Sequence, residues 1–288
     1  MTVVLRTIAE ARAWVRAERG AGRTLGLVPT MGALHEGHAS LFRRARAECD
    51  RAAISIFVNP TQFGAGEDYE RYPRTWESDL RMAEREGVDA VFYPEAGEMY
   101  TEPPLVTVHP GKLGKTLCGP SRPGHFRGVA TVVAKLFHIL QPDRAFFGQK
   151  DAQQVIIIQR MVTDLNFPVA IEVCPTVREP DGLAMSSRNR YLSAEERKNA
   201  TILYQVLRCA ETMFKGGVRD SSRLEQEMER QIQEMIRATP GAELDYARVV
   251  DRWSLQPMGA IDREALVAVA VRFGKTRLID NLILTPEE

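Results

Sequence analysis

Residues 24–49 read TLGLVPTMGALHEGHASLFRRARAEC and set the expected architecture. Residues 24–28, which are mostly apolar, predict a short β-strand, and residues 39–49, with polar residues along one side, predict a helix. Gly32 and Gly37 lie in the turn between them, where glycine lets the backbone approach a ligand closely. A strand that leads through such a turn into a helix is typical of a β-α-β unit.

The same alternation continues on both sides of this segment. A first helix is predicted between a capping box at Thr7 and Glu10 and a stop at Gly20. Further strands are predicted at 52–58, 90–93, 144–147 and 169–173, and further helices at 75–86, 129–140 and 151–165. Elements of these lengths in this order predict an α/β fold, a parallel sheet with helices on both faces.

The pattern changes after about residue 185. The expected elements are a helix from a capping box at Ser193 and Glu196 to about Phe214, a charged helix at 221–238, and strands at 246–250, 266–272 and 276–280, the last two joined by a hairpin around Gly274. We therefore expect two domains, residues 1–185 and a smaller α+β domain at 186–288.

Composition narrows the class of protein. The 288 residues include 38 basic and 38 acidic side chains, so no net charge attracts nucleic acid or an anionic membrane. The four cysteines are widely scattered, which favours reduced thiols over disulfides or a zinc site. The charged N-terminus is unlike a signal peptide, and no apolar run reaches the ~18 residues that span a bilayer. We expect a soluble, cytoplasmic protein.

Two histidines lie in the turn after the first of these strands. His35 and His38 are three residues apart, so both can face one ligand from the first turn of the helix. A helix N-terminus offers unpaired backbone N–H groups and the positive end of the helix dipole, which suit phosphate. A zinc-protease motif is disfavoured because Ala39 stands where the second histidine would be. Two structural histidines that cap the loop are the remaining alternative.

Residues 146–154, FFGQKDAQQ, also follow a strand and open a helix. Gly148 permits a close approach, Lys150 brings a flexible positive charge, and Gln154 presents an uncharged amide. Only seven of the 38 basic residues are lysines, so a lysine at the end of a strand favours a functional role. In the alternative interpretation Asp151 caps the helix and Lys150 is solvated.

Two further segments are candidates. Residues 177–188, VREPDGLAMSSR, are typical of a loop, and two hydroxyls followed by Arg188 suit a triphosphate, although a plain linker would look similar. Residues 57–63, FVNPTQF, end a strand with amide side chains, of which Asn59 is also a common turn residue. Open α/β sheets bind ligands at the carboxyl ends of their strands, where these segments are predicted to lie.

Together with EDYERYPR at 67–74 and RPGHFRGV at 122–129, these segments resemble the pantoate–β-alanine ligase (pantothenate synthetase) family, over roughly residues 28–192. The His-x-Gly-His element alone is shared with the nucleotidylyl transferase superfamily and class I aminoacyl-tRNA synthetases. The resemblance implies a Rossmann-like domain at 1–185 that binds ATP and pantoate, a C-terminal lid domain at 186–288, and a homodimer.

The resemblance also implies a reaction. An ATP-dependent ligase of this family condenses (R)-pantoate with β-alanine through a pantoyl-adenylate and releases AMP and pyrophosphate, with Mg²⁺ carried on ATP. Another adenylate-forming ligase related to class I aminoacyl-tRNA synthetases is the alternative, although the balanced charge and the lack of a basic tRNA-binding domain disfavour it. A nucleotide-binding regulator without catalysis would leave the amides of Gln62 and Gln154 unexplained.

The matched motifs imply which residues contact each substrate. ATP would be contacted by Met31, Gly32, Ala33, Leu34, His35, Glu36, Gly37, His38, Gly148, Gln149, Lys150, Asp151, Val177, Met185, Ser186, Ser187 and Arg188. Gln62 and Gln154 would hold pantoate, and Gln62 also β-alanine. The implied catalytic residues are His38 as proton donor, His35, Lys150 and Arg188. The Mg²⁺ ligands stay open, because Glu77 and Asp79 are expected on the solvated face of a helix.

Overall fold

The structure is a computed structural model that describes residues 1–286, and the chain divides into two compact units. The first unit comprises Met1–Gly114, Arg122–Gly148 and Ile157–Pro175, and the second comprises Lys115–Ser121, Gln149–Ile156 and the chain from Thr176 onward. Two short internal segments therefore group with the C-terminal part. The division into domains at residue 185 stays a prediction.

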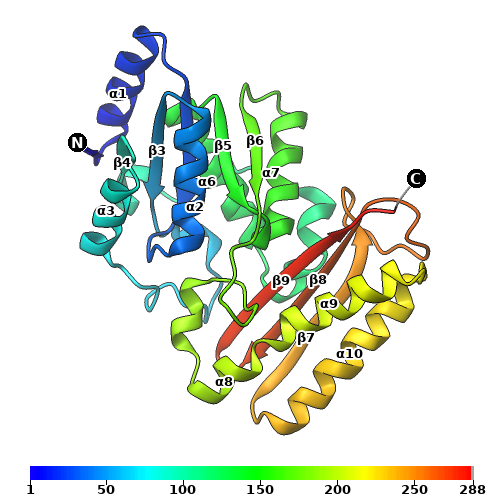
Figure 1. Ribbon diagram of the computed structural model, residues 1–288. Coiled ribbons are helices and arrows are strands. Elements are labelled where there is room, and N and C mark those ends of the chain that lie inside the picture. Colours follow the sequence, from blue (N-terminus) through cyan, green and yellow to red (C-terminus); the bar gives the residue numbers. More distant parts are fainter. Residues whose placement is uncertain (287–288) are drawn as a thin grey trace. The chain divides into compact units, whose positions relative to one another are not determined.

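The first unit is built on a six-stranded sheet with the order β1-β4-β3-β2-β5-β6 (Figure 1). Its strands are β1 (Val3–Leu5), β2 (Leu25–Thr30), β3 (Arg51–Ile56), β4 (Ala90–Phe92), β5 (Arg144–Gly148) and β6 (Ala170–Cys174), and every pairing is parallel. The chain changes direction across the sheet between β2 and β5. In sheets of this kind the carboxyl ends of the strands at that position bind ligands.

Helices cover both faces of this sheet. The helices α2 (Glu36–Glu48) and α3 (Trp76–Arg85) contact each other on one face, and α1 (Ile8–Gly20) and α6 (His125–Leu140) contact each other on the opposite face (Figure 1). The helix α7 (Ala152–Asp164) connects β5 to β6. This arrangement confirms the predicted Rossmann-like fold class.

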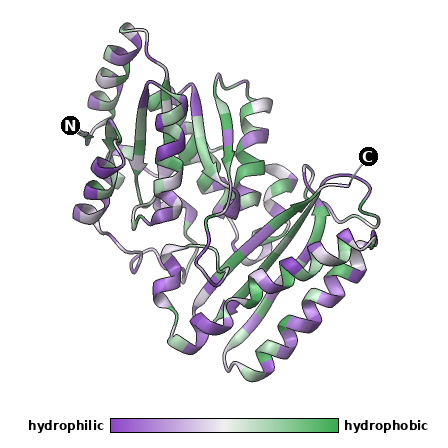
Figure 2. Ribbon diagram, in the orientation of Figure 1, coloured by the Kyte–Doolittle hydropathy of each residue, from purple (hydrophilic) through white to green (hydrophobic). Residues whose placement is uncertain are grey.

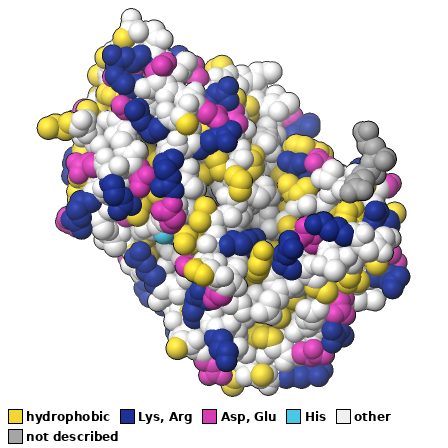
Figure 3. Space-filling view, in the orientation of Figure 1, with side chains coloured by type: hydrophobic (Ala, Val, Ile, Leu, Met, Phe, Trp, Pro, Cys, Tyr) yellow, Lys and Arg dark blue, Asp and Glu magenta, His cyan; other side chains and the backbone are white. Residues whose placement is uncertain are grey.

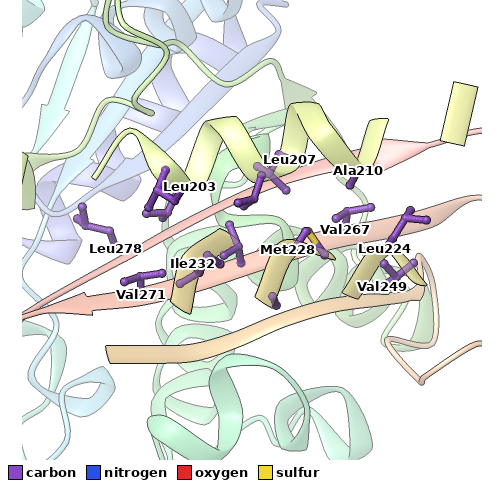
Figure 4. Packing of buried hydrophobic residues seen from close by; sticks show 14 of the residues in the cluster. Leu203, Leu207, Ala210, Leu224, Met228, Ile232, Val249, Val267, Val271 and Leu278 are labelled. Carbon is purple, nitrogen blue, oxygen red and sulfur yellow. The ribbon is translucent and has the colours of Figure 1, made fainter. Parts of the chain in front are cut away.

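The second unit contains a three-stranded antiparallel sheet of β7 (Ala242–Asp251), β8 (Ala265–Phe273) and β9 (Thr276–Leu284). The predicted hairpin is present, since Phe273 pairs with Thr276 and Gly274 has a φ of +52°. The helices α9 (Ile202–Lys215) and α10 (Ser221–Ala238) pack on this sheet, and α10 alternates hydrophilic and hydrophobic residues along its length (Figure 2). Their apolar faces meet the strands through Leu203, Leu207, Leu224, Met228, Ile232, Val249, Val267 and Val271 (Figure 4).

Several boundaries differ from the predictions. Helix α2 begins three residues earlier than expected, because His35 caps it, and α6 begins at His125. The helix expected from the capping box at Ser193 is divided into α8 (Ala194–Asn199) and α9, because Leu203 N–H and Tyr204 N–H bond to carbonyls three residues back. The structure also contains the short elements η1 (Pro60–Gln62), α4 (Ala96–Met99), η2 (Gly111–Lys115), α5 (Cys118–Ser121), η3 (Gln149–Asp151) and η4 (Ser187–Tyr191), none of which the sequence predicted.

The mixture of charges on the surface and the free cysteines agree with what the composition indicated. On the face drawn in Figure 3, Lys and Arg side chains are interspersed with Asp and Glu. The four cysteine thiols are free, and three of them are buried. None of the helices within residues 1–286 has the length and apolar character needed to cross a membrane.

Candidate active site

A buried carboxylate holds the turn between β2 and α2. Asp79 of α3 is only 2% exposed, and its two oxygens accept hydrogen bonds from Ala33 N–H and Leu34 N–H, both at 2.9 Å. The Thr75 hydroxyl donates a third bond at 3.1 Å. The expectation that Asp79 lies on a solvated face is wrong, because α3 turns it to the same side as the buried Ala83, four residues on.

The backbone of this turn is left-handed at two consecutive residues. The φ angle is +84° at Gly32 and +49° at Ala33, and residues other than glycine rarely adopt such values. A Cβ added at Gly32 would lie 3.0 Å from an Asp79 oxygen and 3.1 Å from Ile56 Cγ2. The left-handed φ and these two tight contacts together favour glycine at position 32.

His35 and His38 form the N-terminal cap of α2. His35 Nδ1 accepts a hydrogen bond from Gly37 N–H at 3.2 Å, and His38 Nδ1 accepts one from His35 N–H at 3.3 Å. The two ring centroids are 4.1 Å apart. Because an accepting nitrogen carries no proton, each neutral imidazole holds its proton on Nε2. The pair therefore has the structural role that the sequence left open, and it also presents two Nε2–H donors.

Most backbone N–H groups of this turn already have acceptors within the protein, whereas the sequence-based prediction counted on unpaired ones. The N–H groups of Gly32, Ala33, Leu34, His35 and Gly37 each donate to an acceptor within the protein.

Gln62 lies buried in η1, just after β3. Its Oε1 accepts from Asn59 Nδ2 at 3.0 Å, and its Nε2 lies 3.2 Å from Met31 Sδ. Asn59 is 1% exposed, and its Oδ1 also accepts from Thr61 N–H and the Tyr100 hydroxyl. Two predicted site residues from different turns, Met31 and Gln62, are thus in contact, and Asn59 organises the turn around them.

A charged network behind η1 was not predicted. Arg122 forms a bidentate ion pair with Glu67, with N···O distances of 2.7 and 2.6 Å. Burial raises the pKa of Glu67, but hydrogen bonding and the charge of Arg122 outweigh this, so the net shift is downward. Arg122 Nη1 lies 2.9 Å from His125 Nε2, and a guanidinium only donates, so His125 carries its proton on Nδ1 and donates to Gln62 O at 2.8 Å. The motifs at 67–74 and 122–129 therefore meet behind Gln62.

Helix α6 approaches η1 closely at Gly128. A Cβ added there would lie 2.3 Å from Thr61 O and 2.7 Å from Gln62 Cα. Asn59 Nδ2 also donates to Gly128 O at 3.3 Å. Because position 128 has no side chain, η1 can pack directly against α6. This close packing fixes the position of Gln62.

In the second unit, β9 holds the residues that follow β5. Asn281 Nδ2 donates to Gln149 O at 3.0 Å and to Lys150 O at 2.9 Å, and the Gln149 side chain donates back to Asn281 Oδ1 at 2.8 Å. Lys150 Nζ lies 3.9 Å from Asp151 Oδ1. The last predicted strand ended at residue 280, so Asn281 was missed.

The segment expected to be a loop at 177–188 forms a short hairpin and a 3₁₀ turn. Met185 N–H donates to Val177 O at 3.0 Å, which pairs two predicted ATP contacts. Ser186 Oγ caps η4 by accepting from Arg188 N–H at 3.3 Å. Ser187 is buried, and Gly182 makes the turn with a φ of +94°.

The neighbouring amides Gln153 and Gln154 differ in their environment. Gln153 is buried, accepts from Cys118 N–H at 3.0 Å and donates to Thr116 O at 2.8 Å, so its amide has a structural role. Gln154 is half-buried, and within residues 1–286 its amide has no hydrogen-bond partner. Its side chain therefore retains the capacity to bind a ligand.

Residues 3–283 match the family model described as pantoate-beta-alanine ligase. The pantothenate synthetases of Thermotoga neapolitana and Pelotomaculum thermopropionicum are each 54% identical to this chain, over 98% of it and 99% of their own lengths. The crystal structure of pantothenate synthetase from Thermus thermophilus has a TM-score of 0.90 and 46% identity over 99% of this chain and 100% of that chain. The pantoate-beta-alanine ligase from Francisella tularensis, crystallised with beta-gamma ATP and beta-alanine, has a TM-score of 0.79 and 34% identity over 98% of both chains. From its sequence and its fold, the chain belongs to the pantoate–β-alanine ligase family.

Proposed function

We propose that this chain condenses (R)-pantoate with β-alanine to give pantothenate, through a pantoyl-adenylate, with release of AMP and pyrophosphate. The family match over residues 3–283 supports the overall reaction. The observation that carries the chemistry is the cap of α2, where Nδ1 of His35 and Nδ1 of His38 each accept a backbone N–H, from which we infer that the ring protons lie on Nε2. These donors stand on the turn after β2, at the point where the strand order reverses.

In the first step, a pantoate carboxylate oxygen attacks the α-phosphorus of ATP, and the bond to the bridging oxygen breaks so that pyrophosphate leaves with the electron pair. Negative charge accumulates on the non-bridging oxygens and on the leaving group. Donors fixed before the reaction stabilise this charge without reorganisation. We assign this role to the Nε2–H groups of His35 and His38 and to the positive charges of Lys150 and Arg188.

The remaining ATP contacts are proposed from the motif match alone. They comprise the turn at 31–38, residues 148–151, and residues 177 and 185–188. At Gly148 an added Cβ would meet no protein atom within 4 Å, so protein packing does not explain that glycine, whereas close approach of a ligand would.

Pantoate is proposed to be held by Gln62 and Gln154, and β-alanine to lie beside Gln62. Neutral amides orient a carboxylate without forming a salt bridge, which would lower its nucleophilicity. In the second step the free amine of β-alanine attacks the acyl carbon, and the acyl–phosphate bond breaks to release AMP. We assign to His38 a hydrogen bond from Nε2–H to the departing phosphate oxygen, while the amine releases its proton to solvent as the amide bond forms. Exclusion of other water protects the adenylate until then.

Mg²⁺ is proposed to arrive bound to the phosphates of ATP. Residues 1–286 contain no group of three or more His, Cys, Asp or Glu side chains that could hold a metal ion. No step is attributed to the ion. We also propose a cytoplasmic location, which the free cysteines support.

Isotope exchange between pyrophosphate and ATP tests this function. The protein is mixed with ATP, Mg²⁺ and labelled pyrophosphate, with and without pantoate. We expect label to enter ATP only when pantoate is present, because adenylate formation is then reversible. Exchange that depends on an amino acid instead would indicate a synthetase-like ligase, and absence of exchange under all conditions would contradict catalysis.

A further inference from the structure

We propose that Asp79 is a positioning residue for adenylate formation, which acts through the turn at 31–34 by fixing where the Nε2–H groups of His35 and His38 point. This inference rests on the proposed function and adds to it a residue that touches neither substrate. Asp79 belongs to α3, whereas the histidines belong to the cap of α2. The two helices would therefore have to keep their spacing for the site to work.

The geometry of the carboxylate supports this role. Each oxygen of Asp79 accepts one backbone N–H, from Ala33 and from Leu34, at 2.9 Å. Leu34 immediately precedes His35, so the carboxylate fixes the residue from which the cap begins. The partly buried Leu80, next in α3, packs against the apolar cluster on this face of the sheet, which anchors Asp79 to the fold.

The chemistry of the contacts favours a carboxylate over an amide. Both backbone partners are donors, and the Thr75 hydroxyl adds a third. Asparagine at this position would present an NH₂ group to one of these N–H groups and leave it buried without an acceptor. The turn would then lose support where Ala33 holds its left-handed φ of +49°.

A change in the turn at 31–34 would affect the histidines through one hydrogen bond, from His35 N–H to His38 Nδ1. His38 Nδ1 stays unprotonated because it accepts from His35 N–H. If the turn relaxes, this bond lengthens, and the His38 proton can occupy either ring nitrogen. The Nε2–H donor of His38 would then be lost in part of the molecules, so the negative charge of the proposed transition state would be less well stabilised. The substrates could still bind.

A cavity of about 310 Å³ leads to the same carboxylate from the surface. Its lining includes Gly32, Trp76 and Asp79, together with the exposed residues Arg6 and Glu95. Removal of the Asp79 side chain would enlarge this cavity by the volume of a carboxylate. Formate is small enough to enter there and to accept the same two N–H groups.

The experiment compares the wild-type chain, Asp79→Asn, Asp79→Ala and the control Glu77→Gln, which changes an exposed acid of the same helix. Pantoate-dependent pyrophosphate exchange is measured, with and without formate. We expect both Asp79 variants to lower kcat on the order of 100-fold, as for a misplaced catalytic group, with KM for ATP and pantoate little changed. We also expect formate to restore activity in Asp79→Ala but not in Asp79→Asn.

A second measurement follows the histidine protons directly. ¹⁵N spectra of histidine-labelled protein should show unprotonated Nδ1 at both positions in the wild type and mixed tautomers in Asp79→Asn, a signal that a purely structural role would not change. Near-wild-type kcat in both variants, or unchanged tautomers, would overturn the inference. Lack of exchange in the wild type would instead refute the proposed function, so the two failures are distinguishable.

Discussion

At the scale of single residues, the hydrogen bonds of each histidine ring determine which ring nitrogen carries the proton. His35 and His38 use Nδ1 as an acceptor within the cap of α2, whereas His125 accepts at Nε2 and donates from Nδ1 to Gln62 O. Residues of one type therefore present protons at different atoms. The histidine spacing in the sequence indicates that a pair exists, but not which nitrogen carries the proton.

We expect His38→Ala to slow adenylate formation by about 2.7–4 kcal/mol in activation free energy, by analogy with the loss of one oxyanion donor. The reason is that one Nε2–H donor is removed from the turn. Single-turnover quench-flow kinetics measure this, with the exposed His109→Ala as the matched control. A near-normal rate in His38→Ala would remove this residue from the mechanism.

We expect Gln62→Ala to raise KM for pantoate more than KM for ATP, because the amide is assigned to pantoate. Steady-state kinetics with each substrate varied in turn give both constants. Equal increases in the two constants would refute the assigned role. Part of the effect will come from Asn59 Nδ2, which donates to Gln62 Oε1 in the native protein and loses this partner.

At the scale of elements, the close approach of α6 to η1 sets the position of Gln62. We expect Gly128→Ala to destabilise the protein by about 1–3 kcal/mol, because the added Cβ lies only 2.3 Å from Thr61 O and overpacks the contact. We also expect a higher KM for pantoate. Urea unfolding and kinetics measure the two effects. The control is Gly97→Ala, since a Cβ at Gly97 meets nothing within 4 Å; equal behaviour of the two variants would refute this packing argument.

The turn after β7 provides a test of pH dependence. Burial raises the pKa of Asp251, but hydrogen bonds from Ser254, Arg263 and Trp253 N–H lower it to about 2, from 3.8. Because the folded pKa lies below the unfolded value, the stabilisation is fully present above about pH 4 and is lost as pH falls towards 2. We expect Asp251→Asn to cost about 1–2 kcal/mol at neutral pH and almost nothing near the folded pKa. Urea unfolding across this range measures the difference, and a pH-independent difference would contradict the assignment.

At the scale of the whole molecule, we propose that the chain forms a homodimer through the N-terminal domain, as the family resemblance implies. Light scattering at micromolar concentration should then report twice the chain mass of 32.3 kDa. A monomer under these conditions would refute the proposal. Dilution series with activity measured in parallel would show whether turnover depends on assembly.

The sequence alone determined those features that arise from contacts between near neighbours. The capping boxes at Thr7 and Ser193, the turn at Gly274 and the alternation of strands and helices were all predicted, and all are present. The periodicity of apolar residues and the capping of helices depend on residues within about one turn of each other. Both can therefore be recognised from the sequence without knowledge of the fold. The motifs also predicted the family.

The tertiary structure decided which distant groups meet. The partners Leu34 and Asp79 are 45 residues apart, Glu67 and Arg122 are 55 apart, and Gln149 and Asn281 are 132 apart. These pairings depend on strand order and on how each helix turns about its axis, which no local pattern specifies. Asp79 was therefore assigned to the solvent because charged side chains are seldom buried, whereas its burial follows from two backbone N–H groups that only the folded sheet brings to it.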